Sequence, residues 1–373
     1  MRIAFFAPHK PIDHPLPSGD LIIGRTLHDF LKAQDHKMMI ASRFRLRHIT
    51  GKPLKWPALY LEFRRALNRV KKFNPDLWLT YHSYYKSPDL FGPYISATLG
   101  IPYVIYQGVF ATKYRRKFKT WPGYMINKNA LLNADHVFAN KAVDFQNLSR
   151  IILPEKLSHT SPGIDTSIFS YCRQSADRIR DKYNLHDKKV ILSAAMLRED
   201  VKAESISDLI DAFKPVVEEI PEARLIIAGD GEARSRLQKS ASYKVGDKII
   251  FLGRIERQEM YKYYSSADFF AYPGINEAFG MVYLEAQCCG LPVLAYSTRG
   301  PQEAVAHGET GLLSPQGDIA GLSRNMLKLL KDKDLRERMS KAAPQRIKKN
   351  FDLNDNLRCV NIKLEEIISR RDR

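Results

Sequence analysis

Short apolar runs alternate along the chain with longer amphipathic stretches in which apolar residues recur at helical spacing. The runs are rich in Ile, Val, Leu and aromatic residues and are bounded by Gly, Pro, Asn or charged residues, which is typical of strands buried on both faces of a parallel sheet. Strands are expected at residues 3–7, 37–41, 77–81, 103–106 and 136–139, and again at 190–194, 223–228, 249–252, 269–272 and 292–296. With helices between these strands, the pattern predicts an α/β fold with two doubly wound domains.

The expected domain boundary lies between these two sets of strands. Residues 161–169 (SPGIDTSIF) combine a Pro-Gly turn with a short buried strand and lead into a charged helix at 174–183. A last amphipathic helix is expected at 353–369. We therefore predict an N-terminal domain at 1–168, a second domain at 169–352 and a C-terminal helix at 353–373.

Residues 90–112 form the longest uncharged segment and are numerous enough to span a bilayer, but Pro93, Gly100 and Pro102 interrupt them. They predict a helix at 89–99, a turn and a buried strand instead. The chain opens with RIAFFAP, so no secretion signal is expected. The four cysteines lack CxxC spacing and favour free thiols in a reducing compartment, hence a cytoplasmic protein.

The segment 276–292 (NEAFGMVYLEAQCCGLP) carries the strongest chemical signal. Gly280 stands where a loop is expected to enter a helix, because Met281 and the residues after it are compatible with a helix that ends near Gly290. The missing side chain would let a ligand approach, and the N–H groups of Gly280, Met281 and Val282 would point at it from the positive end of the helix. Such a site suits a diphosphate.

Two carboxylates, Glu277 and Glu285, flank this junction. Glu277, in the loop, could accept hydrogen bonds from sugar hydroxyls, and Glu285, inside the helix, could hold a ribose diol. The alternative is that Glu277 is only a favourable charge at a helix N-terminus and Glu285 a solvated helix residue.

The pair resembles the E-x7-E motif of the family-4 retaining glycosyltransferases, which have the two-domain GT-B fold. The similarity extends over roughly residues 190–313, through LIIAGDGE (225–232), IIFLGRI (249–255), GLPVLAY (290–296) and GPQEAVAHGETGLL (300–313). It implies two Rossmann-like domains facing a central cleft, a C-terminal helix that crosses back to the first domain, and a nucleoside-diphosphate sugar, UDP- or GDP-linked, as donor.

The resemblance also assigns the diphosphate to Lys202, in the loop after the first strand of the second domain. The family pattern has an arginine where this chain has Met196, and Arg198 is expected to supply the missing charge. The alternative for Lys202 and Arg198 is a solvated charged loop.

Further donor contacts are implied at three loops. Gly229 lies in a Gly-Asp-Gly turn whose Asp230 could equally cap the next helix. Arg254 and Ile255 would lie beside the nucleobase. Gly19, in the loop HPLPSGD (14–20), resembles the glycine that closes over the donor phosphates, although a single glycine in a loop is also typical of a simple turn.

The catalytic centre departs from the family pattern, because Gln107 replaces the histidine of a common His-Gly pair. Glutamine transfers no proton but can donate a hydrogen bond to the donor sugar or diphosphate. His82 matches a second family histidine and is a catalytic candidate, with a structural or capping role as the alternative. His9 is a similar, weaker candidate.

No metal requirement is expected. The one D-x-D sequence, Asp332 and Asp334, lies in a charged helical region far from the glutamates and reads as a solvated face. Lys202, Arg198 and the helix N-terminus could stabilise the departing diphosphate without a divalent ion.

The positive charge is concentrated in the first domain. Residues 1–170 hold 25 Lys and Arg against 11 Asp and Glu, a net of +14 out of +18 for the whole chain. Basic and aromatic residues interleave at 43–48, 63–73 and 113–124, which suits an anionic membrane surface and thus a lipid-linked acceptor. The alternatives are a solvated basic surface or a nucleic-acid site, for which no RNA-binding signature is present.

We therefore predict a retaining glycosyltransferase that moves a hexose-type sugar from a nucleotide sugar to a hydroxyl of a saccharide or lipid-linked acceptor, in cell-surface polysaccharide or glycolipid synthesis. It would be cytoplasmic and bound peripherally to the inner face of the membrane. The alternatives are an epimerase-like sugar-nucleotide enzyme of the same fold, or a basic membrane- or nucleic-acid-binding protein with a vestigial donor site.

Overall fold

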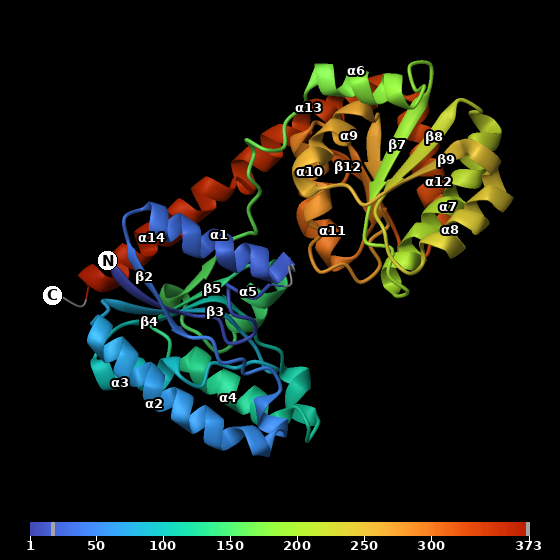
Figure 1. Ribbon diagram of the computed structural model, residues 1–373. Helices are drawn as coiled ribbons and strands as arrows, with labels where there is room; N and C mark the ends of the chain where they lie inside the picture. Colours follow the sequence, from blue (N-terminus) through green and yellow to red (C-terminus); the bar gives the residue numbers. More distant parts are fainter. Residues whose placement is uncertain (16–18, 371–373) are drawn as a thin grey trace. The chain divides into compact units, whose positions relative to one another are not determined.

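Two six-stranded sheets, wholly parallel, form the framework of the protein in the computed structural model, which describes residues 1–15 and 19–370 (Figure 1). The chain divides into two compact units. The first unit runs from Met1 to Pro162 and includes the C-terminal segment from Asn354, and the second unit is Gly163–Leu353.

The first unit has the strand order β2-β1-β3-β4-β5-β6. Its strands are β1 Arg2–Phe6, β2 Lys37–Ser42, β3 Leu77–Ser83, β4 Tyr103–Gly108, β5 His136–Ala139 and β6 Leu157–His159. Its helices are α1 Gly19–Ala33, α2 Trp56–Phe73, α3 Gly92–Leu99, α4 Trp121–Leu132, α5 Ala142–Leu148 and α14 Leu353–Ser369, with short 3-10 helices η1 Ile49–Gly51, η2 Pro53–Lys55, η3 Thr112–Arg116 and η4 Pro154–Lys156. Helices α1 and α14 cover one face of the sheet, and α2, α3 and α4 cover the other (Figure 1).

The second unit has the strand order β12-β11-β10-β7-β8-β9. Its strands are β7 Lys189–Ala194, β8 Ala223–Ala228, β9 Ile249–Gly253, β10 Phe269–Ala271, β11 Val293–Tyr296 and β12 Gly311–Ser314. Its helices are α6 Arg173–Lys182, α7 Val201–Glu219, α8 Arg234–Val245, α9 Met260–Ser266, α10 Met281–Cys288, α11 Arg299–Ala304, α12 Ile319–Lys331 and α13 Lys333–Asn350, with η5 Gly246–Lys248 and η6 Arg257–Glu259. Helices α7, α8 and α12 pack on one face, and α6, α9 and α10 on the other (Figure 1).

The predicted α/β fold with two doubly wound sheets is confirmed, and the physical reason is burial on both faces. In β1, for example, Ile3, Ala4, Phe5 and Phe6 are all fully buried, so side chains that point to opposite faces are both covered by helices. A large burial of apolar surface of this kind is the main stabilising contribution to such a domain.

Three details differ from the sequence prediction. The edge strands β6 and β12 were not expected, because each is very short and lies among polar residues and glycines. The short strand expected within 161–169 does not form. Ile164 instead makes a single bridge to Asp352, and the boundary between the units lies at Pro162 and Gly163.

The C-terminal helix α14 belongs to the first unit, as the resemblance implied. Its residues Leu357, Val360 and Leu364 are buried, and the Asn361 amide oxygen lies 2.6 Å from His36 Nε2 at the start of β2. Residues 90–112 form α3 and β4, as predicted, and none of the helices described is both long and apolar enough to cross a bilayer.

Candidate functional site

Helix α10 begins, as expected, directly after Gly280, at the carboxyl edge of the second sheet. Gly280 has a left-handed backbone, with φ of 83°, and a Cβ there would lie 2.3 Å from the buried ring of Tyr283. Only glycine fits this turn without strain. The N–H groups of Met281 and Val282 belong to the first turn, where a helix has no internal acceptors, so they are available to a ligand.

Glu277 and Lys202 form an ion pair at this position. The Lys202 ammonium donates to Glu277 Oε2 at 2.9 Å, and both side chains are 19% exposed. Burial alone would lower the pKa of Lys202, but the neighbouring Tyr272 and Glu277 outweigh it and raise that pKa, so the ammonium stays charged. The residues predicted to hold the donor sugar and the diphosphate are thus adjacent. A ligand must either bind to the intact Lys202–Glu277 ion pair or break it.

Glu285 is buried, and its two oxygens have separate partners. Oε1 accepts from Arg257 Nε at 2.7 Å, and Oε2 accepts from the Tyr264 hydroxyl at 3.1 Å. Each oxygen keeps a lone pair for a further donor such as a ribose hydroxyl. Sequence reasoning missed Arg257 and Tyr264, although Arg257 stands in a short polar turn just after the expected nucleobase loop.

Arg198 and Arg254 lie in more exposed positions and pair with close neighbours in the sequence. Arg198 contacts Asp200 at 3.1 Å, and Arg254, 77% exposed, contacts Glu256 at 3.4 Å. Asp200 also caps α7 by accepting from the Lys202 N–H at 2.8 Å. The arginines therefore remain free to turn toward a ligand, at little cost.

The loop after β7 and the loop after β8 are held together by their backbones. A Cβ at Gly229 would lie 1.8 Å from the Ala195 carbonyl oxygen, and Leu197 donates its N–H to the Asp230 carbonyl at 2.9 Å. The close approach requires glycine at position 229. Asp230 does not cap α8, since the residue before that helix is Ala233 and makes no side-chain cap.

In the first unit, His82 and Gln107 lie at the carboxyl ends of the neighbouring strands β3 and β4. Both are non-glycine residues with a left-handed backbone, φ of 59° and 65°. Such conformations cost about 1 kcal/mol or more each and concentrate at functional sites.

Asp20, which the sequence reasoning did not select, brings these two residues together. Its Oδ1 lies 2.6 Å from His82 Nδ1 and accepts from Gln107 Nε2 at 3.4 Å, while its carbonyl accepts from the Tyr81 hydroxyl at 2.6 Å. Burial alone would raise the pKa of Asp20, but the contact with His82 lowers it below its usual value. Asp20 therefore remains an anion beside the imidazole.

His9 packs against His82, with ring centroids 5.6 Å apart. Burial, followed by the neighbouring His82, lowers the pKa of His9 to about 4, so it is neutral at pH 7. Gly19 begins α1, next to Asp20. Three residues of the loop 14–20, numbers 16–18, lie outside the described residues.

The residues described contain no cluster of His, Cys, Asp and Glu with the geometry of a metal site. Asp332 caps α13 by accepting from the Leu335 N–H at 2.8 Å, which gives the D-x-D sequence a structural role.

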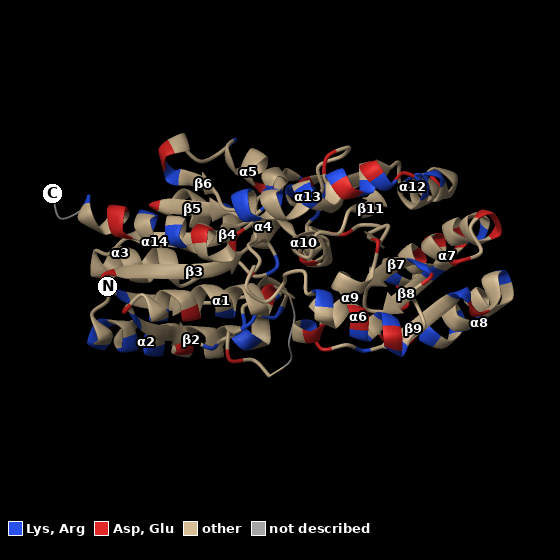
Figure 2. Ribbon diagram, turned by 90° about the horizontal axis from the view of Figure 1, so that it is seen from above, with Lys and Arg blue, Asp and Glu red and all other residues tan. Residues whose placement is uncertain are grey.

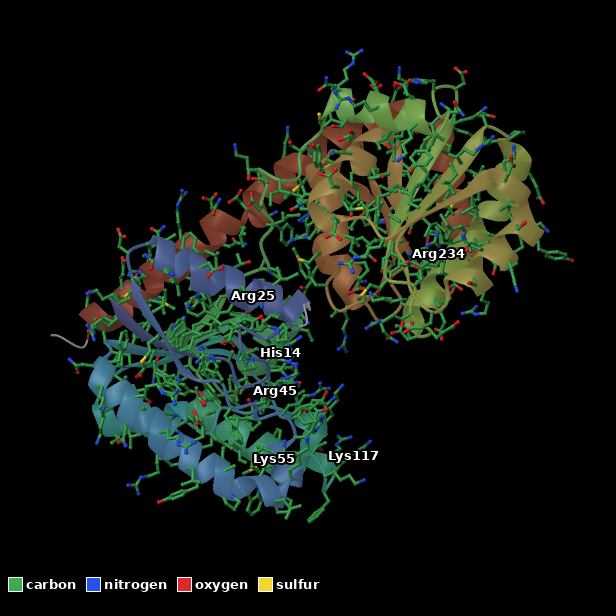
Figure 3. All side chains as sticks on the ribbon, viewed as in Figure 1. His14, Arg25, Arg45, Lys55, Lys117 and Arg234 are labelled. Carbon is green, nitrogen blue, oxygen red and sulfur yellow. The ribbon has the colours of Figure 1, made fainter. Side chains whose placement is uncertain are left out.

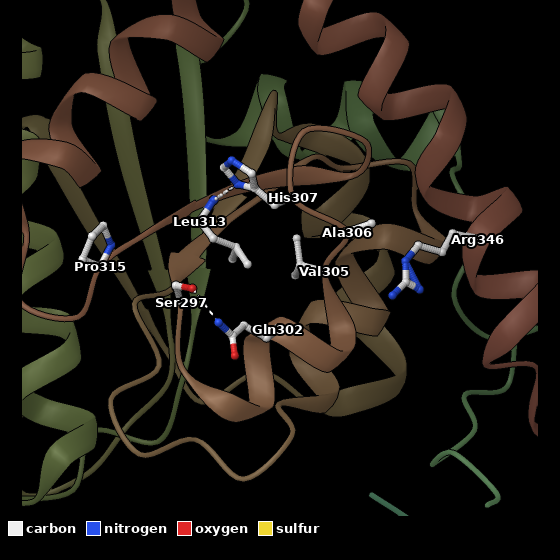
Figure 4. A pocket seen from close by; sticks show the side chains of 8 residues that line it. All are labelled: Ser297, Gln302, Val305, Ala306, His307, Leu313, Pro315 and Arg346. Atoms are coloured by element: carbon white, nitrogen blue, oxygen red, sulfur yellow. Dashed lines mark hydrogen bonds between the residues drawn. The ribbon is translucent and has the colours of Figure 1, made fainter. Parts of the chain in front are cut away.

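A separate pocket of about 490 Å³ lies beside α11 and β12 in the second unit (Figure 4). Its lining comprises Ser297, Gln302, Val305, Ala306, His307, Leu313, Pro315 and Arg346. His307 Nδ1 accepts from the Leu313 N–H at 2.9 Å, which leaves Nε2 as the protonated nitrogen. The sequence prediction did not include this pocket.

Comparison with known proteins agrees with these features. Residues 175–346 match the family model for glycosyl transferases group 1. The GDP-mannose-dependent alpha-(1-6)-phosphatidylinositol monomannoside mannosyltransferase of Mycolicibacterium smegmatis is 32% identical over 184 residues, 47% of each chain. Sulfoquinovosyl transferase SQD2 of Arabidopsis thaliana is 25% identical over 296 residues, 76% of this chain and 56% of that one.

These alignments span about half the length of the curated relatives. Among solved structures, Anabaena HepE in complex with UDP superposes with a TM-score of 0.77 over 98% of this chain and 100% of that one, at 17% identity, which shows a shared GT-B fold. The matched segment, just under half of the chain, is thus similar to glycosyl transferases group 1, and it contains the glycine-initiated helix and both glutamates.

Proposed function

We propose that this protein is a retaining glycosyltransferase that moves a sugar from a nucleoside-diphosphate sugar to a hydroxyl of a saccharide or lipid-linked acceptor. The observation that carries the proposal is the Lys202–Glu277 ion pair beside the Gly280 turn. A cation, a carboxylate and free N–H groups in one place match the diphosphate and the hydroxyls of such a donor.

The proposed roles follow from these contacts. Glu277 accepts from donor-sugar hydroxyls, and Glu285 from the ribose. Lys202 and Arg198 stabilise the charge that develops on the diphosphate as the glycosidic bond breaks, with Gly280, Met281 and Val282 as backbone donors. Gly19 and Gln107 are further donor contacts in this proposal, and Gly229, Arg254 and Ile255 would line the nucleotide end of the donor.

The reaction we propose needs no nucleophile from the protein. The acceptor oxygen attacks the anomeric carbon from the face on which the diphosphate leaves, and its proton passes to the departing phosphate oxygen. Lys202 and the α10 N–H groups act on that oxygen, so they supply the charge stabilisation for which other enzymes use a divalent ion. His82 would lie beside the reacting groups as a catalytic residue.

Relatives support a nucleotide-sugar donor, since the mycobacterial relative is named as GDP-mannose-dependent and HepE was solved with UDP. A thermal-shift screen against UDP-, GDP- and ADP-sugars would test the proposal, because a ligand that binds only the native state raises its melting temperature. A rise with none of them would contradict it. Release of labelled sugar from the nucleotide only when an acceptor is present would separate transfer from an epimerase-like reaction.

We further propose that the first unit binds the anionic inner face of the cell membrane peripherally and takes its acceptor there. Lys and Arg recur along α2 (Figure 2), and large apolar side chains there and near η3 are exposed, with Leu54 at 96% and Phe118 at 92%. Exposed Trp56 and Trp121 lie beside them. Basic side chains with aromatic and apolar neighbours suit a lipid headgroup layer.

Contacts within the first unit link these segments. The Trp56 indole, at the start of α2, donates to the Ile49 carbonyl at 3.1 Å. The N–H of His48, which precedes Ile49, donates to the Lys86 carbonyl at 2.6 Å. Tyr85, which precedes Lys86, stacks its ring on Tyr114 of η3. Arg45, Lys55 and Lys117 from these segments are labelled in Figure 3.

Liposome pelleting tests the membrane proposal. Binding to phosphatidylglycerol vesicles that falls with salt and is absent with phosphatidylcholine would support it, and the double change Trp56→Ala with Trp121→Ala should weaken it. Binding to single-stranded nucleic acid in gel shifts, with none to vesicles, would contradict it.

A further inference from the structure

Tyr272 is buried beside the Lys202–Glu277 ion pair of the second unit. It directly follows β10, at the carboxyl edge of the sheet, and is 1% exposed. The Lys202 ammonium lies over its ring, 5.7 Å from the ring centre. A cation in this position is attracted by the face of the aromatic ring, so Lys202 has a second support besides Glu277.

The Tyr272 hydroxyl contacts the same ammonium. It lies against both Lys202 and Ser205, and both contacts are poorly formed hydrogen bonds. Burial raises the pKa of Tyr272, so the hydroxyl keeps its proton at pH 7. Ser205 Oγ donates to the Val201 carbonyl at 2.8 Å, accepts from the Ile275 N–H at 3.0 Å and keeps a second lone pair. The hydroxyl of Tyr272 can therefore donate to Ser205 while its oxygen accepts from Lys202.

The backbone of Tyr272 is held from two sides. Its N–H donates to the Leu294 carbonyl of β11 at 3.0 Å, and its carbonyl accepts from the buried Tyr283 hydroxyl of α10 at 3.1 Å. The ring of Tyr283 also packs against that of Tyr272, with centroids 6.0 Å apart. Tyr272 therefore presents its ring and its hydroxyl to Lys202 from a rigid support.

We propose that Tyr272 is a positioning residue that keeps the Lys202 ammonium directed at the donor diphosphate when Glu277 binds the hydroxyls of the donor sugar. This assignment rests on the proposed function, in which Glu277 accepts from those hydroxyls and holds Lys202 less tightly. A lysine side chain released from its only partner would regain rotamer freedom, and ordering it again would weaken phosphate binding. Tyr272 prevents this loss through Lys202 and needs no contact with the donor itself.

Calorimetry with UDP and GDP, and with uridine and guanosine, tests this role. Tyr272→Phe keeps the ring and removes only the hydroxyl, so it should weaken diphosphate binding by about three- to tenfold and leave nucleoside binding unchanged. Tyr296→Phe is the matched control. Tyr296 is buried at the end of the neighbouring strand β11, but its hydroxyl donates to Asp208 at 2.8 Å, and its loss should not change diphosphate binding.

A double-mutant cycle separates positioning from a general effect on the fold. In a Lys202→Met background, Tyr272→Phe should cause no further loss of diphosphate binding, because the group through which it acts is absent. A second loss as large as the first would show that Tyr272 acts independently of Lys202 and would overturn the proposal. The melting temperature of Tyr272→Phe should stay close to that of the unaltered protein, since no well-formed hydrogen bond is removed.

Acylation of Lys202 by acetic anhydride, followed by peptide mass spectrometry, needs no nucleotide. The Tyr272 hydroxyl stabilises the charged ammonium, which does not react, so Tyr272→Phe should raise the acylation rate of Lys202 by about two- to fivefold. Tyr296→Phe should leave the rate unchanged.

Unchanged diphosphate binding or an unchanged acylation rate in Tyr272→Phe would overturn the positioning role. If neither UDP nor GDP binds the unaltered protein, the transferase proposal fails, and the acylation rate alone decides whether Tyr272 positions Lys202.

Discussion

The carboxyl edges of the two six-stranded parallel sheets differ in their chemistry. In the second unit the edge is built from full charges in pairs, Lys202 with Glu277 and Arg257 with Glu285, around a glycine that opens a helix. In the first unit it is built from an imidazole and amides around the single carboxylate of Asp20, on a strained backbone.

The difference shows how one fold can hold two kinds of ligand. Paired charges and a helix N-terminus favour a diphosphate, whose charge they can neutralise. Amide and imidazole groups favour hydroxyl groups, which need directional hydrogen bonds.

Glu277→Gln should reduce sugar transfer by about 100- to 1000-fold, because the neutral amide can neither accept as strongly from donor hydroxyls nor pair with Lys202. Turnover of a labelled nucleotide sugar measures it. Glu218→Gln, on the exposed side of α7, is the control and should leave transfer and melting temperature unchanged. Near-normal transfer by Glu277→Gln would remove Glu277 from the site.

Lys202→Ala should weaken nucleoside diphosphate binding by about 10- to 100-fold, since it removes the half-buried ammonium to which we assign the phosphates. Calorimetry with UDP or GDP, whichever binds, measures the loss. The corresponding nucleoside should lose much less affinity, because it lacks the diphosphate. Equal losses for both would show that Lys202 acts on the fold rather than on the phosphates.

The two buried asparagines of the first unit should respond to the same substitution to different extents. Asn127→Leu removes two good hydrogen bonds and should lower the free energy of unfolding by about 1–3 kcal/mol. Asn140→Leu should lower it less, because the Asn140 amide has only a poorly formed contact with the Tyr106 hydroxyl. Urea unfolding compares the two variants, and an equal loss in both would contradict this difference.

Arg257→Met should lower the free energy of unfolding by about 1 kcal/mol, because buried Glu285 loses its cation and keeps only Tyr264. The estimate is at the low end since the Arg257 side chain is 46% exposed. Arg254→Met, three residues earlier and far more exposed, is the control and should have almost no effect. Equal melting temperatures for the two variants would contradict a structural pairing of Arg257 and Glu285.

The first unit should also be the more acid-sensitive one. His9 and His136 each have a pKa lowered to about 4, mainly by burial, so the unfolded chain binds their protons from pH 6.5 downward while the folded chain stays neutral. The free energy of unfolding therefore falls as the pH drops from 6.5 to 4, by about 1 kcal/mol for half-buried His9 and by more for His136, which is 1% exposed. His9→Gln should flatten this slope in urea unfolding, and an unchanged slope would show that His9 is protonated in the folded state.

Much of the fold could be predicted because strand and helix patterns are local. Strands 136–139 and 223–228 and helix 353–369 form as expected, since their apolar period and their glycine or polar boundaries are written in consecutive residues. The edge strands β6 and β12 were missed because three or four residues give too little pattern to separate a strand from a loop.

The candidate site could likewise be predicted only where its residues form a local motif in the sequence. The residues selected from the sequence in the second unit stand in a recognisable local motif, with Gly280 at the start of α10 and Glu277 and Glu285 on either side. Asp20, Asn140, Arg257 and Tyr264 have no such local signal. Each is recognised only by its contact with a residue that is distant in the chain.

The sequence alone determined the α/β class, the two doubly wound domains and the glutamate motif of this protein, because periodicity, glycine turns and motif spacing are properties of neighbouring residues. Only the tertiary structure decided which groups are paired: Lys202 meets Glu277, Arg257 meets Glu285, and His82 and Gln107 meet Asp20. Hydrogen bonds and ion pairs act over a few ångströms, and that proximity is created by strands and loops that the chain brings together from far apart.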